Sequence, residues 1–60
     1  MSVSVLDENG RVQEQGEAVQ GRGDWWEYVP SATGKIIVEA RDLPGNKVTA
    51  ELLGSDEFQY

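Results

Sequence analysis

Carboxylates are the most frequent reactive side chains in this chain of 60 residues. The sequence has 11 Asp and Glu residues but no histidine and no cysteine. Paired carboxylates can serve as general acid and base, but only in a desolvated cleft, for which so small a domain has little room. A Ser or Cys nucleophile needs a base, almost always histidine, and Lys35 and Lys47 lie in exposed, strand-like contexts that argue against a Ser–Lys pair. We therefore predict no catalytic residues, no enzymatic activity and no cofactor.

Acidic turns are also candidates for metal binding. In an EF-hand loop that began at Asp7, the sixth residue would be Gly and the twelfth Glu. Gly10 is instead the fourth residue and Ala18 the twelfth, so the match fails. Without Cys or His, a structural zinc site is not expected. We predict no metal, with Asp42 and Asn46 as the candidates for a looser calcium site, although turn chemistry alone accounts for both.

Aromatic residues are concentrated in Asp24–Val29, which has strong strand propensity. Because side chains alternate along a strand, Trp26 and Tyr28 share one face and Trp25 lies on the other. We expect Trp26 and Tyr28 to enter the core. Trp25 is then a structural cover, part of a protein interface, or a carbohydrate platform together with Tyr60 or Tyr28, since exposed Trp is enriched at interfaces.

The charge balance excludes two classes of partner. The net charge is −6 and the sequence pI is about 4.3, so DNA, RNA and anionic membrane surfaces would be repelled. No stretch approaches the about 20 apolar residues of a membrane helix, so membrane insertion is not expected. The acidic surface favours solubility, a basic protein partner or adaptation to high salt. The N-terminus has neither the basic nor the apolar region of a signal peptide.

Gly34–Leu53 carries the strongest structural pattern, two alternating runs around a turn. We predict a β-hairpin with a type II turn, in which Pro44 is the first central residue and Gly45 supplies positive φ at the second. The other face carries Ile37 and Leu53 together with charged and polar residues, namely Glu39, Arg41, Lys47, Thr49 and Glu51. The predicted core face of the hairpin consists of Ile36, Val38, Ala40, Val48, Ala50 and Leu52.

Weaker patterns complete the prediction. Ser2–Leu6 alternates as a half-buried strand, and Asn9-Gly10 predicts a type I′ turn after it. Arg11–Gln20 reads as an edge strand with a bulge or bend at Gly16, with a helix as the competing interpretation. The last residues form a tail whose aromatic side chains, Phe58 and Tyr60, could dock on the body.

Together these segments give five candidate strands and an all-β fold. We predict a small antiparallel meander that forms a compact barrel or a partial sandwich. The domain spans residues 1–54, and 55–60 form the C-terminal tail. The expected core adds Val3, Val5, Trp26 and Tyr28 to the six hairpin residues.

One part of the chain resembles a known family. Trp26–Tyr28, followed by Gly34–Asn46, looks like the C-terminal half of bacterial immunoglobulin-like repeats, which often run W-x-Y, a loop, then G-x-x-x-V-x-A-x-D-x-x-G-N. Ala40, Asp42, Gly45 and Asn46 match that spacing, and the likeness extends to Leu53. It implies a non-catalytic spacer or adhesion module of a surface or phage structural protein, extracellular or on the cell surface. Some members bind calcium at turn acids, which would again indicate Asp42 and Asn46.

The chain departs from that family in length. Such sandwiches have about seven strands and about 100 residues. A shorter chain is a truncated sandwich, a different small β fold with the same turn, or part of a domain that another copy completes.

We therefore expect a non-catalytic structural or protein-binding β module. Open strand edges and thin burial favour self-association, through strand pairing or through an apolar face containing Trp25 and Ile37. One alternative is an acidic decoy or inhibitor of a basic, nucleic-acid-binding protein, and another is a carbohydrate-binding module that uses an exposed Trp. The candidate binding residues are Trp25, Tyr28, Ile37 and Tyr60.

Overall fold

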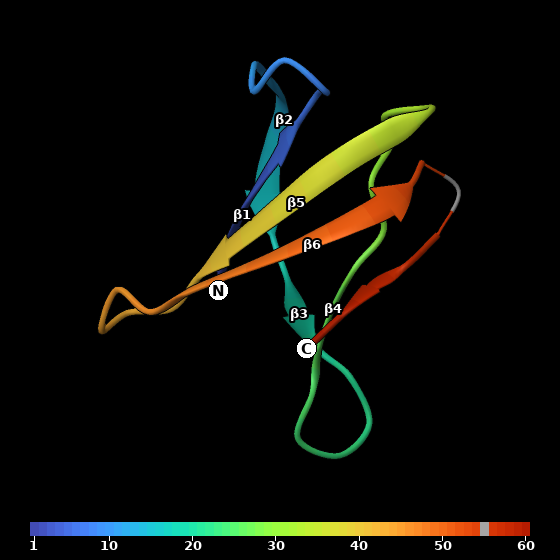
Figure 1. The fold of residues 1–60 in the computed structure, drawn as a ribbon. Coiled ribbons are helices and arrows are strands. Elements are labelled where there is room, and N and C mark those ends of the chain that lie inside the picture. Colours follow the sequence, from blue (N-terminus) through green and yellow to red (C-terminus); the bar gives the residue numbers. More distant parts are fainter. Residues whose placement is uncertain (55) are drawn as a thin grey trace.

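The fold consists of two antiparallel sheets. A computed structural model describes residues 1–54 and 56–60, and the four-stranded sheet has the order β2-β1-β5-β6 and the three-stranded sheet the order β3-β4-β7 (Figure 1). The all-β prediction is confirmed, although the chain forms more strands than expected, and the two sheets do not close into a barrel. In the described residues no helix is long and apolar enough to cross a membrane. The strands are β1 (Ser2–Leu6), β2 (Val12–Glu17), β3 (Val19–Gln20), β4 (Trp26–Tyr28), β5 (Lys35–Arg41), β6 (Lys47–Leu53) and β7 (Phe58–Gln59).

The predicted main hairpin is present as β5 and β6. Its register places Val38 opposite Ala50, and the neighbouring core pairs follow two residues away on each side. The core side of β5 is buried, while that of β6 is half-buried because β6 lies at the sheet edge. The face assignment from the alternating sequence is therefore confirmed for both strands. β1 lies against the other side of β5, so the sheet is not a simple meander.

The turn between β1 and β2 differs from the prediction. The N–H of Gly10 donates to the carbonyl of Asp7 at 3.0 Å, and the N–H of Asp7 donates to the carbonyl of Arg11 at 2.9 Å. Gly10 has φ 83°, whereas no non-glycine residue in the described part has positive φ, so the type I′ turn at Asn9-Gly10 is wrong. The loop has three residues and ends in a left-handed glycine, a common hairpin form. The Asp7 carboxylate selects it by accepting the N–H groups of Asn9, at 2.8 Å, and Arg11, at 2.9 Å.

The turn between β5 and β6 has the same form. The N–H of Gly45 donates to the carbonyl of Asp42 at 3.0 Å, and Gly45 has φ 94°. The predicted type II turn is wrong by one position: Pro44 is the second central residue, where a type II turn needs positive φ that proline cannot adopt. The Asp42 carboxylate accepts the backbone N–H of Asn46 at 2.8 Å, as Asp7 does for Arg11.

The segment predicted as one bulged edge strand is divided between the two sheets. β2 is an edge strand, as expected, and the chain crosses to β3 at Ala18, which is buried and donates its N–H to the carbonyl of Met1 at 2.9 Å. The bulge is at Gln13, because Val5 pairs with Glu14 whereas Leu6 pairs with Val12. It was therefore expected at the wrong residue, Gly16.

The core lies between the two sheets. Val3, Val5, Ile36, Val38 and Ala40 are buried as predicted, and the other predicted core residues are half-buried against them. Ala18 and Phe58 are buried as well. Neither belongs to the predicted core, although Phe58 is one of the two tail aromatics that could dock on the body. Phe58 is 1% exposed, and β7 pairs with β4 where a tail was expected. Residue 55, at the start of that predicted tail, lies outside the described residues.

Candidate binding surfaces

An apolar row crosses the outward face of the four-stranded sheet. Leu6 pairs with Val12 on one side and with Ile37 on the other, so these three side chains share a face; we call them the outer patch. Val12 is 55% exposed, and Leu6 and Ile37 are half-buried. The bulge matters here, because without it Leu6 would face the polar Gln13. Aliphatic residues therefore occupy a position that faces solvent.

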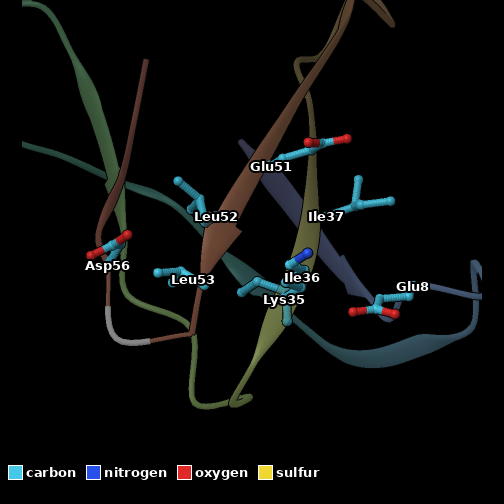
Figure 2. Close-up of a pocket in the computed structure, with 8 residues that line it drawn as sticks. All are labelled: Glu8, Lys35, Ile36, Ile37, Glu51, Leu52, Leu53 and Asp56. Atoms are coloured by element: carbon cyan, nitrogen blue, oxygen red, sulfur yellow. The ribbon is translucent and has the colours of Figure 1, made fainter.

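A shallow groove of about 540 Å³ begins at the outer patch and continues around the end of the β5–β6 hairpin. Figure 2 shows Ile37 and Glu8 on one side of the hairpin and Leu53 and Asp56 on the other. Three carboxylates and one ammonium group border the apolar centre, so the rim is acidic. The lining residues are Glu8, Lys35, Ile36, Ile37, Glu51, Leu52, Leu53 and Asp56.

A second groove, of about 520 Å³, lies beside the β5–β6 turn. Trp26 and Tyr60 exchange two backbone hydrogen bonds, of 2.8 and 3.0 Å, so their side chains share one face of the three-stranded sheet. Tyr60 is 59% exposed. Met1 also lines this groove, so both ends of the described chain meet there, and its ammonium group lies 3.5 Å from the carboxylate of Glu17.

Trp25 lies apart from both grooves. Its indole covers two glycines, since a Cβ added at Gly23 would lie 2.9 Å from the ring and one added at Gly21 would lie 2.6 Å from Nε1. The indole N–H donates to the carboxylate of Glu27. Trp25 is 39% exposed and lines neither of these grooves, whereas Ile37 lines the first.

Tyr28 connects the two sheets. Its hydroxyl donates to Oε2 of Glu14 at 2.6 Å, and Oε1 of Glu14 accepts the N–H groups of Ser31, at 2.9 Å, and Ala32, at 2.8 Å. Burial, with the negative Glu14 beside it, raises the pKa of Tyr28 to about 12. The Tyr28 hydrogen bond lowers the pKa of Glu14, which partial burial opposes and the two backbone donors reinforce. The hydroxyl of Tyr28 therefore already has a hydrogen-bond partner within the molecule, Glu14.

The four candidate residues from the sequence do not form one site. Ile37 lines the first groove, Tyr60 the second, and Trp25 and Tyr28 neither. Sequence reasoning missed Leu6 and Val12 as outward apolar residues. The outward position of Leu6 could have been predicted, because Leu6 alternates with the inward valines of its strand as Ser2 and Ser4 do.

The calcium candidates are bonded to each other. Oδ1 of Asp42 accepts the backbone N–H of Asn46, and Oδ2 accepts its side-chain amide at 3.2 Å. Asn46 thus presents a donor, not a metal-binding oxygen, to the carboxylate. Within residues 1–54 and 56–60, no group of three or more Asp, Glu, His or Cys side chains could hold a metal ion.

Most charged side chains remain free to meet a partner. In the part of the chain that the structure describes, the one ion pair within 4 Å joins the Met1 ammonium group to Glu17. The net charge of −6 is therefore not neutralised locally. Comparison with models of known families, with curated proteins and with solved structures gives no match to this chain.

Proposed function

We propose that this chain is a non-catalytic protein-binding module, which docks an apolar and basic segment of another protein over the outer patch and the adjoining groove. The observation that carries the proposal is the row Val12–Leu6–Ile37, three aliphatic side chains aligned across the exposed face of a sheet. Covering each of these side chains with apolar atoms removes hydrocarbon surface from water, which is favourable in proportion to the area covered.

The acidic rim determines the charge of the partner. Glu8, Glu51 and Asp56 border the groove with only Lys35 to offset them. Lys or Arg side chains of a docked segment can bury their aliphatic stems against the patch while their charged ends reach these carboxylates. Binding should therefore weaken with added salt.

Two alternatives remain predictions. An acidic decoy of a nucleic-acid-binding protein would present a row of carboxylates at phosphate-like spacing, whereas the rim carboxylates surround an apolar centre. Carbohydrate binding would use Trp25 together with Tyr60 or Tyr28, but Trp25 and Tyr28 line neither groove and only Tyr60 lines the second. An adhesive role of the immunoglobulin-like kind, extracellular or on the cell surface, would use the same outer patch.

The test is selection of peptides from a random display library against the full chain, with counter-selection against Ile37→Ser. Ile37 is half-buried and outward, so this variant keeps the core pairs of β5, and its far-UV circular dichroism should match wild type. Gln15→Thr, on the exposed edge strand, is the matched control. Enriched peptides should combine aliphatic with Lys or Arg residues and lose about tenfold or more in affinity for Ile37→Ser, but not for the control.

Two results would overturn the proposal. One is a set of enriched peptides that bind Ile37→Ser as tightly as wild type. The other is enrichment that depends on Tyr60, measured with Tyr60→Ser, because binding would then belong to the second groove.

A further inference from the structure

β6 leaves one of its sides unpaired. Asn46 and Gly54, just outside the strand, bond to Asp42 and Gly34 across the hairpin, the latter at 2.8 Å from N–H to carbonyl. Because bonding alternates along an antiparallel pair, Val48, Ala50 and Leu52 bond to β5. The N–H and carbonyl groups of the residues between them, Lys47, Thr49 and Glu51, therefore point away from the sheet. No other strand among the described residues pairs with β6.

Both ends of this free edge are blocked. At the C-terminal end the carbonyl of Leu53 accepts the N–H of Asp56 at 2.8 Å, so the chain folds back there. At the N-terminal end the Asp42–Asn46 turn closes the hairpin. The available edge is thus the short stretch Lys47–Glu51, whose three outward-bonding residues are all exposed and form no ion pair in the described part of the chain.

The edge begins with a positive residue, Lys47, and ends with a negative one, Glu51, so two copies that run in opposite directions bring opposite charges together. We infer that β6 pairs antiparallel with β6 of a second copy, with Thr49 opposite the partner's Thr49. Lys47 then faces the partner's Glu51, and Glu51 faces the partner's Lys47. Each facing pair exchanges two backbone hydrogen bonds, and each opposite-charge pair adds a favourable side-chain contact. Two four-stranded sheets become one continuous sheet about a two-fold axis.

Other registers of the same pairing are disfavoured. A shift of two residues in either direction places Thr49 opposite the partner's Lys47 or Glu51, so both opposite-charge pairs are lost. A shift of four residues places Lys47 opposite the partner's Lys47, or Glu51 opposite the partner's Glu51. Like charges directly opposite each other are destabilising. A shift of one residue aligns outward-bonding residues with residues already bonded to β5. The charge pattern therefore selects one register and a closed dimer.

The other edge of the four-stranded sheet, β2, offers a competing partner. Pairing of β6 with β2 of another copy would place Lys47 near the partner's Glu17 and would continue without closing. In this chain, however, the Glu17 carboxylate lies 3.5 Å from the Met1 ammonium group, and the amide of Gln13 donates to Asp7 at 3.1 Å. These contacts occupy two of the β2 side chains, so the closed β6 dimer is preferred. Species larger than a dimer would indicate pairing of β6 with β2 instead.

The experiment is sedimentation velocity of the full chain over a wide range of concentrations. Wild type should show a monomer–dimer equilibrium with no larger species. Lys47→Glu and Glu51→Lys should each raise the dimer dissociation constant by about tenfold, because each places like charges opposite each other twice per dimer. The double variant Lys47→Glu/Glu51→Lys should restore the wild-type constant. An equimolar mixture of the two single variants should form a mixed dimer, since its facing charges are again opposite.

Two controls separate this pairing from general effects of charge and fold. Lys35→Glu, on an inner strand, makes the same charge change and should leave the dimer intact. Thr49→Pro removes an N–H that points away from β5, so the monomer should fold while dimerisation is lost. A chain that stays monomeric at all concentrations, dimers that survive Thr49→Pro, or a double variant that fails to recover would each overturn the inference. Glu51 lines the groove beside the outer patch, whereas Lys47 and Thr49 do not. Peptide binding by Lys47→Glu and Thr49→Pro should therefore equal that of wild type even where dimerisation is lost, so the two proposals fail separately.

Discussion

The ring of Tyr28 lies directly over Gly16, so that a Cβ added at Gly16 would be 2.8 Å from Cε1 and 2.9 Å from the hydroxyl oxygen of Tyr28. Gly16 pairs with Val3 in the four-stranded sheet, whereas Tyr28 belongs to the three-stranded sheet. The glycine thus leaves room for an aromatic ring from the opposite sheet, and the ring in turn covers the exposed glycine backbone. The hydroxyl is fixed beyond the glycine by Glu14.

Gly16→Ala should therefore destabilise the protein by about 1 to 3 kcal/mol, measured by urea unfolding. Gly16 does not have positive φ, so Ala brings no backbone strain and, without the ring, would stabilise by restricting the unfolded chain. A loss of stability in Gly16→Ala, rather than a gain, would therefore show that the Tyr28 ring contacts this position. In the background of Tyr28→Leu the penalty should shrink, and an equal penalty in both backgrounds would mean that the ring is not its cause.

Tyr28 should ionise late in an alkaline titration. Its pKa in the folded chain is raised from 10.0 to about 12, mainly by burial and then by Glu14. The protonated form is therefore favoured by folding, and its contribution to stability is complete below pH 10 and is lost as the pH rises from 10 to 12. Ultraviolet difference absorbance should show one phenol titrating near pH 12, and Tyr28→Phe should remove it. A titration unchanged by that substitution would contradict the assignment.

Glu14 should make stability depend on acidic pH. Its pKa is lowered from 4.5 in the folded chain, chiefly by the Tyr28 hydroxyl. The ionised form is favoured by folding, so its contribution is present above pH 4.5 and is lost as the pH falls through the lower folded-state pKa. Glu14→Gln should lower the free energy of unfolding at neutral pH by about 1 to 2 kcal/mol and flatten its decline in acid. The control Glu8→Gln removes one exposed charge and should leave the free energy of unfolding at neutral pH near that of wild type.

The fold was predictable wherever a strand was long enough to alternate. In β5 and β6 seven residues each repeat the pattern, so Val38 and Ala50 were assigned to the core correctly. β3 and β7 have two residues each, too few for any period to appear. β3 was therefore predicted only as the continuation of the strand before it, and β7 was predicted as a tail. Phe58 enters the core through its pairing with Tyr28, a contact between distant segments that local pattern does not encode.

The turn types and the outer patch could not be predicted from the sequence, for two different reasons. Asn9-Gly10 and Pro44-Gly45 were interpreted from their dipeptides alone, whereas the aspartate three residues before each glycine bonds back to the loop and shifts the turn by one position. The outer patch depends on the bulge at Gln13, whose position the sequence does not mark. The sequence marks Gly16 as an interruption of a strand. It does not reveal that the ring packed over this glycine comes from Tyr28, in the other sheet.

The C-terminal strand β7 offers the last prediction, because it supplies one of the largest fully buried side chains of the core, Phe58. Phe58 is 1% exposed and packs in the core between the sheets, so Phe58→Ala should cost about 3 to 5 kcal/mol, close to the whole stability of a domain this small. The variant should lose its cooperative thermal transition, measured by near-ultraviolet circular dichroism. Gln59→Ala, the exposed neighbour in β7, is the matched control and should melt as wild type does. If Phe58→Ala also melts as wild type does, the C-terminal segment is dispensable and the domain ends at β6.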